Sequence, residues 1–131
     1  MRYLLDTTVA LWSIAEPHKL NTRAKSVLEE SSSDFYLSAA SVWEIAIKYA
    51  LGNLRLHTPP REFVTQLMSD LKLQPLPIVA DHTIEAGELP KIHDDPFDRM
   101  LVAQARMEGM SLLTADRIIM KYEVEAIQSR R

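Results

Sequence analysis

The stretch "DDPFDRMLVAQARMEGMSLLTAD", from Asp94 to Asp116, decides the fold. A proline suited to the first turn of a helix opens an apolar pattern with helical spacing, and Gly109 ends it. The apolar run from Ser111 to Thr114 then has the length of a buried strand and leads directly to an acid. A helix followed at once by a short buried strand is typical of α/β proteins with a parallel sheet.

The rest of the chain repeats this alternation of short strands and helices. Strands are expected at residues 2–6, 34–38, 73–78, 111–116 and 122–127, and helices at residues 8–16, 21–32, 39–53, 61–72, 80–90 and 96–108. Strands joined through helices imply right-handed crossovers. The sequence therefore predicts one α/β domain over residues 1–131 with a mostly parallel sheet.

Composition excludes several classes of protein. The 131 residues are 47% hydrophobic, which is enough to form a core, and they include no cysteine, so disulfides and thiolate chemistry are excluded. There is no P-loop and no dinucleotide-binding turn. The net charge of -3 gives no bulk attraction to nucleic acid, so such binding would need local basic groups or a bound cation.

The first apolar run has neither the length nor the flanks of a targeting or membrane segment. It is interrupted by Asp6 after only a few residues, so it is neither a secretory signal nor a membrane span. We therefore expect a soluble, cytoplasmic protein without membrane contact.

Four acids stand out by their position relative to the expected elements. Asp6 and Asp116 follow strands, and Glu44 and Asp98 lie near the beginnings of helices. Ligands of open α/β sheets bind beyond the carboxyl ends of the strands, so we expect these four side chains to converge there. Crowded carboxylates raise one another's pKa, and a divalent cation relieves the repulsion. Hard oxygen ligands suit Mg²⁺ or Mn²⁺, with Asp6 and Asp98 as direct ligands and Glu44 and Asp116 direct or through water.

Each of the four acids, taken alone, is also explained as a helix or turn cap. Two details favour a shared site. Ser38 is an earlier cap for the helix that carries Glu44, which moves Glu44 into the second turn. The run "DDPFD" also holds more acid than one cap requires, because Asp95 followed by Pro96 already suffices.

Four motifs together resemble a known family. They are "LLDTTVALW" at residues 4–12, "LSAASVWEIAIKYALGNL" at 37–54, "DPFDRMLVAQA" at 95–105 and "LLTAD" at 112–116. In order and spacing they resemble the PIN-domain ribonucleases, and most of all the VapC-type toxins of bacterial toxin–antitoxin pairs. The resemblance extends from Arg2 to about Asp116.

This resemblance implies a three-layer α/β/α PIN-like domain with about five short strands, and an endoribonuclease that depends on Mg²⁺ or Mn²⁺. It implies that Asp6, Glu44, Asp98 and Asp116 are the catalytic acids, with Thr114 as a supporting residue. It also implies a homodimer and a cognate antitoxin whose tail occupies the acidic groove, often through an arginine. One departure is Thr8, where close relatives carry a histidine.

Several further residues have two interpretations. Lys48, Arg99 and Arg117 either contact RNA phosphates or pair with carboxylates. His93, just before the acidic run, is more often a loop residue than a catalytic one. Trp12 and Trp43 are expected in the core or at a dimer interface, and the segment Ser129–Arg131 is expected to be solvated or disordered.

Two functions of other classes compete with the nuclease. One is a receiver-type signalling domain, but that class has an acidic pair after its first strand and a lysine after a late one, whereas threonines follow Asp6 here. The other is a catalytically silent α/β binding module whose acids only cap helices.

Overall fold

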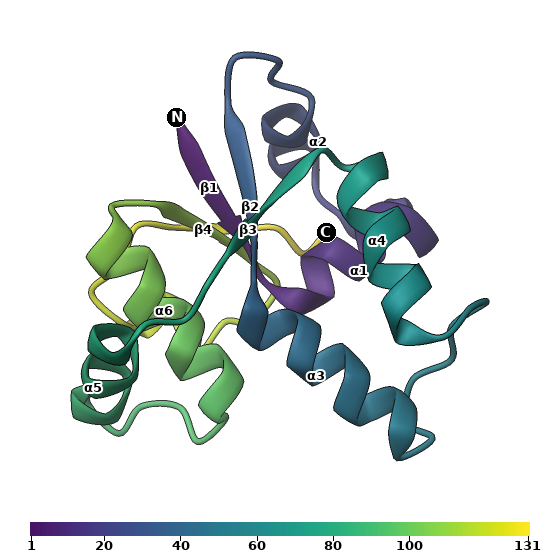
Figure 1. Ribbon diagram of the computed structural model, residues 1–131. Coiled ribbons are helices and arrows are strands. Elements are labelled where there is room, and N and C mark those ends of the chain that lie inside the picture. Colours follow the sequence, from purple (N-terminus) through teal and green to yellow (C-terminus); the bar gives the residue numbers. More distant parts are fainter.

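The computed structural model describes residues 1–131 and contains one five-stranded parallel sheet (Figure 1). The strands are β1 (Arg2–Leu5), β2 (Asp34–Ser38), β3 (Leu73–Leu76), β4 (Ser111–Thr114) and β5 (Ala126–Gln128), in the order β3-β2-β1-β4-β5. The helices are α1 (Thr7–Ala15), α2 (Thr22–Leu28), α3 (Ala39–Ala50), α4 (Pro60–Asp70), α5 (Ala80–Glu88) and α6 (Pro96–Glu108). None of these helices combines the length and the apolar character needed to cross a membrane.

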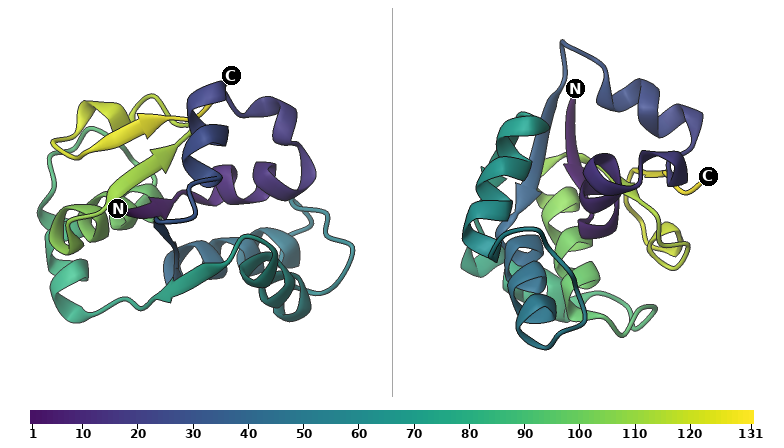
Figure 2. Two further views of the ribbon diagram at one scale, coloured as in Figure 1. Left: turned by 90° about the horizontal axis from the view of Figure 1, so that it is seen from above. Right: turned by 90° about the vertical axis from the view of Figure 1, so that its right-hand side faces the viewer.

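Helices cover both faces of the sheet, because alternate residues of each strand point to opposite sides. Tyr3 and Leu5 of β1 join a core with residues of α1, α2 and α4, whereas Leu4 joins a second core with residues of α5 and α6. Seen from above, the sheet separates the green α5 and α6 from the purple and blue α1 and α2 (Figure 2, left). The expected three-layer α/β/α arrangement with five strands is therefore confirmed.

Side-chain caps fix the beginnings of the helices that surround the site. The carboxylate of Asp6 accepts a hydrogen bond from a backbone N–H of α1, and the hydroxyl of Ser38 does the same for α3. Asp95 caps α6, with Pro96 in the first turn. At its other end α6 stops at Gly109, whose φ of 66° is the left-handed conformation that glycine adopts without strain.

The order of the strands creates a crevice beyond the ends of β1 and β4. β1 is central, and the chain proceeds from it to β2 on one side, whereas β4 lies on the other. Ligands in α/β proteins bind where the order of strands reverses in this way. Asp6 directly follows β1 and Asp116 lies two residues beyond β4, so both acids lie at this crevice.

Two expected elements differ most from the structure in their bounds. The helix expected over 21–32 stops at Leu28, and the backbone N–H of Glu30 then donates to the carbonyl of Val27, three residues back, which tightens the last turn of the helix. The strand expected over 122–127 is shorter and later, at Ala126–Gln128. Tyr122 does not join it, because its ring is buried in the second core.

The expectation that the segment Ser129–Arg131 is solvated holds for the exposed Arg130 and Arg131 but not for the buried Ser129. The backbone N–H of Ser129 donates to the carbonyl of Thr114 at 2.7 Å, and its carbonyl accepts from the N–H of Asn21 at 2.9 Å. Ser129 is fully buried, and an antiparallel bridge joins Arg130 to Leu20. The segment thus continues the β5 edge of the sheet toward the crevice.

Candidate active site

One cavity of about 430 Å³ brings together all four acids predicted from the sequence. Its charged lining consists of the carboxylates of Asp6, Glu44, Asp95, Asp98 and Asp116 and the cationic side chains of Lys48, Arg117 and Arg130. Five carboxylates against three cations leave an excess of negative charge in one pocket. That excess suits a divalent cation, and the donors are the hard oxygens that Mg²⁺ and Mn²⁺ prefer.

Asp6 is the most firmly fixed of these acids. Its side chain is 3% exposed, and its two oxygens accept hydrogen bonds from the backbone N–H groups of Val9 at 2.7 Å and Ala115 at 2.9 Å. Burial raises the pKa of Asp6, although these bonds and the Thr114 hydroxyl oppose the rise. One carboxylate thus caps α1, holds the end of β4 and lines the pocket.

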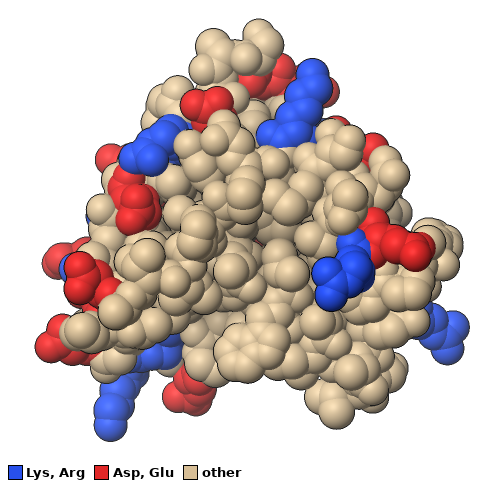
Figure 3. Space-filling model, viewed as in Figure 1, with Lys and Arg blue, Asp and Glu red and all other residues tan.

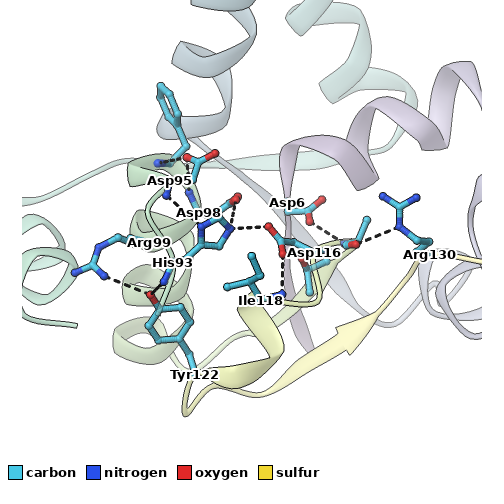
Figure 4. Close-up of polar contacts among 12 residues, drawn as sticks. Asp6, His93, Asp95, Asp98, Arg99, Asp116, Ile118, Tyr122 and Arg130 are labelled. Atoms are coloured by element: carbon cyan, nitrogen blue, oxygen red, sulfur yellow. Dashed lines mark hydrogen bonds and ion pairs between the residues drawn. The ribbon is translucent and has the colours of Figure 1, made fainter. Parts of the chain in front are cut away.

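Asp98 and Asp116 approach each other across the ring of His93 (Figure 4). The Nε2 atom of His93 lies 2.6 Å from Oδ2 of Asp116 and 3.0 Å from Oδ2 of Asp98. Burial, together with the negative charges of nearby carboxylates, raises the pKa of Asp98 to about 7. Crowding of the carboxylates thus adds to burial in raising the pKa of Asp98.

His93 serves here as a hydrogen-bond donor to the carboxylates. Its Nδ1 accepts a bond from the N–H of Asp95 at 3.1 Å, so in the neutral ring Nε2 carries the proton and points it at the two acids. Burial lowers the pKa of His93, but the surrounding carboxylates outweigh burial and leave it raised. The pKa of Asp116 is lowered overall. Burial raises it, but the hydrogen bonds from His93 and from the N–H of Ile118 outweigh burial.

Because the Nε2 proton of His93 occupies the side of the ring that faces the acids, the carboxylate oxygens are the groups left to hold a cation. Nε2 of His93 and oxygens of Asp98 and Asp116 lie within 4.8 Å of one another, and Asp6 and Glu44 line the same pocket. The residues present therefore fit a divalent cation held by oxygen ligands. The sequence favours a loop role for His93, and its place just before the acidic run is the one signal that points to the site.

Glu44 and Lys48 form the ion pair that their spacing predicts. Nζ of Lys48 lies 2.7 Å from Oε2 of the buried Glu44, and this hydrogen bond raises the pKa of Lys48. Both side chains line the pocket, as does Arg117. Thr114 is buried beneath them, and its hydroxyl accepts the N–H of Asp116 at 3.0 Å.

Arg99 lies outside the pocket and contacts neither carboxylates nor the open crevice. Its guanidinium donates to the carbonyls of Ala86, Leu89 and Pro90 at 2.8–3.0 Å and so satisfies the end of α5. It also donates to the hydroxyl of Tyr122 at 3.3 Å, which in turn accepts the N–H of His93 at 2.8 Å. Neither interpretation of Arg99 from the sequence fits this placement, and its role is to hold the loop that carries His93.

The sheet order and the acidic pocket at its crevice define a PIN domain. The model of the PIN domain family matches residues 3–124, and the chain belongs to this family. Ribonuclease VapC22 of Mycobacterium tuberculosis is 30% identical over 115 residues, which cover 87% of this chain and 86% of that protein. The resemblance to VapC-type PIN domains seen in the four motifs is therefore confirmed.

Chains with a similar fold are also found among solved structures. VapBC2 from Rickettsia felis, in a crystal structure with a DNA fragment from its promoter, contains a chain with a TM-score of 0.71 at 17% identity, covering 97% of this chain and 98% of that one. DNA-bound VapBC from Salmonella typhimurium contains one with a TM-score of 0.68 at 15% identity, covering 97% of each chain. At these identities the likeness concerns the fold.

Proposed function

We propose that this chain is the toxin of a type II toxin–antitoxin pair and an endoribonuclease that hydrolyses RNA phosphodiester bonds in the acidic pocket with Mg²⁺ or Mn²⁺. The observation that carries the proposal is the convergence of the four sequence-predicted acids in one cavity with an excess of negative charge. The relation to Ribonuclease VapC22 supports the choice of reaction. A divalent cation bound there would activate a water molecule and offset charge on a phosphate oxygen.

The residues around the pocket have distinct parts in this proposal. Asp6 and Asp98 hold the cation directly, and Glu44 and Asp116 hold it directly or through water. Two backbone N–H groups fix the orientation of Asp6, so that carboxylate needs no rearrangement during the reaction. The Nε2 proton of His93 orients the other two aspartates.

Lys48 and Arg117 are the expected contacts for RNA phosphates, since both line the pocket. The face of the molecule in Figure 3 carries only scattered Lys and Arg side chains between wide uncharged areas. With a net charge of -3, the chain has no bulk attraction for RNA. Binding therefore depends on the cations at the rim of the pocket.

The proposed partners follow from the same relatives. Similar chains occur in VapBC complexes from Rickettsia felis and Salmonella typhimurium, and another match is described as a toxin–antitoxin complex from Klebsiella pneumoniae. These likenesses support a cognate antitoxin for this chain, together with the predicted homodimer. With RNA as the substrate, we expect the activity in the cytoplasm.

Cleavage of structured RNA by the purified chain tests the proposed function. We expect cleavage with Mg²⁺ or Mn²⁺, none in EDTA, and a loss of about a hundredfold or more in Asp98→Asn. Asp94→Asn is the matched control, because Asp94 is an exposed neighbour outside the pocket. Cleavage that persists in EDTA, or an Asp98→Asn variant as active as the parent, would refute the proposal.

Calorimetry with Mn²⁺ separates the enzyme from a silent binding module. We expect binding by the parent and none by the double variant Asp6→Asn/Asp98→Asn. Affinity should fall as the pH drops through about 7, because Asp98 must lose its proton to bind a cation. Binding that is unaffected by the double substitution, or flat between pH 8 and 5.5, would favour the silent module.

A further inference from the structure

Arg130 lines the proposed catalytic pocket, although it lies outside every motif that predicts the acids. Its Nε donates to the carbonyl of Ala115 at 3.4 Å, directly before Asp116 (Figure 4). Ala115 also donates its own N–H to the carboxylate of Asp6. The guanidinium therefore lies beside Ala115, which is hydrogen-bonded to Asp6 and directly precedes Asp116 in the chain.

An aromatic face supports this guanidinium. Cζ of Arg130 lies 4.8 Å from the centroid of the Trp12 ring, which is within the range of a cation–π interaction. Trp12 comes from α1, the helix capped by Asp6, so the support and the acid belong to the same element. An arginine side chain stacked on a half-buried ring loses less conformational entropy on binding a ligand than an arginine side chain that moves freely.

The backbone at Arg130 is held as firmly as its side chain. Its N–H donates to the side-chain oxygen of Gln128 at 3.0 Å, and its carbonyl accepts from the side-chain amide of Asn21 at 3.3 Å. The same amide of Asn21 also donates to the carbonyl of Gln128 at 2.6 Å. These bonds, with the bridge to Leu20, fix the direction in which the arginine leaves the sheet edge.

Arg130 has no carboxylate partner, although five carboxylates line the same cavity. The ion pairs of the chain involve Lys19, Lys48, His82 and His93, and the only side-chain bond donated by Arg130 comes from Nε. The two terminal nitrogens are thus left to face an external group. A planar guanidinium with two free donors matches the geometry of a phosphate.

We propose that Arg130 is a substrate-binding residue that holds a non-bridging phosphate oxygen of the RNA, and that Trp12 is a positioning residue that fixes its guanidinium. This inference rests on the proposed ribonuclease function and assigns a specific contact within it. Arg130, Lys48 and Arg117 line one acidic pocket, an arrangement that suits a polyanion passing over a cation site. The partner of Arg130 itself must carry negative charge, so a phosphate of RNA fits this position, whereas an arginine of an antitoxin tail would pair with the carboxylates of the pocket.

Steady-state cleavage by Arg130→Gln and Arg130→Lys tests the proposal, with Arg131→Gln as the matched control. Arg131 carries the same charge one residue away, but its guanidinium points to the carbonyl of His18 outside the pocket. We expect Arg130→Gln to raise KM about tenfold with kcat changed less than about threefold. This pattern indicates the loss of a contact that is equally strong in the substrate complex and in the transition state. Arg130→Lys should restore part of the loss, and Arg131→Gln should behave as the parent.

The salt dependence gives a readout that a structural role would not change. Loss of one phosphate contact should reduce the slope of log kcat/KM against log salt by about 0.7 for single-stranded RNA. Trp12→Phe, which keeps an aromatic ring with weaker cation attraction, should raise KM in the same direction by a smaller factor. Urea unfolding of each variant checks that the fold is intact.

The outcomes distinguish a failure of the proposed ribonuclease function from a failure of the proposed contact between Arg130 and RNA. A parent protein that cuts no RNA refutes the proposed function, and with it this contact. A parent that cuts RNA while Arg130→Gln keeps the parental KM and salt slope refutes the contact alone. Loss of antitoxin affinity in Arg130→Gln with RNA kinetics unchanged would assign the residue to the antitoxin instead and would also overturn the proposal.

Discussion

Replacing Asp98 by asparagine should stabilise the protein in EDTA, and more so at high pH than at low pH. The pKa of Asp98 is raised from its usual 3.8 to about 7, first by burial and then by the charges of Asp95 and Asp6. Between these two pKa values the folded protein binds a proton that the unfolded chain does not. The free energy of unfolding therefore falls as the pH rises through this window, and the full penalty is present above pH 7.

The size of this effect follows from the same pKa. A rise from 3.8 to about 7 corresponds to about 4 kcal/mol. The side chain of Asp98 is 19% exposed, and screening by solvent reduces the net penalty to about 1–2 kcal/mol. The charge of Asp98 is one of the causes that raise the pKa of His93, so the difference between parent and variant reports the interacting pair of Asp98 and His93.

Urea unfolding at pH 5, 6, 7 and 8 in EDTA, followed by tryptophan fluorescence, measures the effect. The parent should lose about 1 kcal/mol relative to Asp98→Asn between pH 5 and 8, because part of the penalty is already present at pH 5. Asp94→Asn, which removes a charge from the same loop outside the pocket, should follow the parent. If the parent and Asp98→Asn give parallel curves, the carboxylates of the pocket do not strain one another and the electrostatic basis of the cation site fails.

Further substitutions at Asp6, Thr114 and Gly109, with Gly87 as a control, separate the folding roles of these residues from their chemical roles. Asp6→Asn keeps one acceptor oxygen but turns an NH2 group toward the second backbone N–H, so the free energy of unfolding in urea should fall by about 1–3 kcal/mol while RNA cleavage falls at least about a hundredfold; a folded variant that cleaves RNA like the parent would contradict this. Thr114→Val leaves the N–H of Asp116 without its acceptor and should cost about 1–3 kcal/mol in urea, whereas Thr114→Ser should cost less. Gly109→Ala should lower the free energy of unfolding by about 1 kcal/mol without changing cleavage, because its φ is 66° and no backbone atom crowds the new Cβ. Gly87→Ala, a helical position with open space, should instead be neutral or stabilising in the same measurement.

The sequence predicts most of the fold because its signals are local. Asp95 and Pro96 mark the beginning of α6 and Gly109 marks its end, and four-residue strands such as β4 are apolar enough to be recognised alone. β5 is the exception. Residues 122–127 alternate in polarity as a strand does, but Tyr122 is held elsewhere because its hydroxyl donates to Pro90 and accepts from His93. That contact spans about thirty residues, and no local pattern contains it.

The residues of the candidate site also fall into a group that the sequence predicts and a group that it does not. The four acids were predictable because each follows a strand or begins a helix, and the strand order brings those positions to one crevice. His93 is placed by Asp116, 23 residues away, and Arg130 by Trp12 from the opposite end of the sequence. Such residues acquire their roles from tertiary contacts. In the sequence alone, they are a loop histidine and an arginine near the end of the chain.

Capping and metal binding are alternative explanations of acids at the beginning of a helix, but in the proposed cation site the two roles are distributed among particular carboxylates. At α6, Asp95 takes the capping bonds from Phe97 and Asp98, and this leaves the carboxylate of Asp98 turned toward His93. At α1, Asp6 performs both tasks, since each of its oxygens accepts one backbone N–H and a carboxylate oxygen has a second lone pair. The cap holds the acid rigid, and a rigid carboxylate is what a preorganised cation site requires. The acids of "DDPFD" therefore exceed the needs of the helix because only one of them serves it.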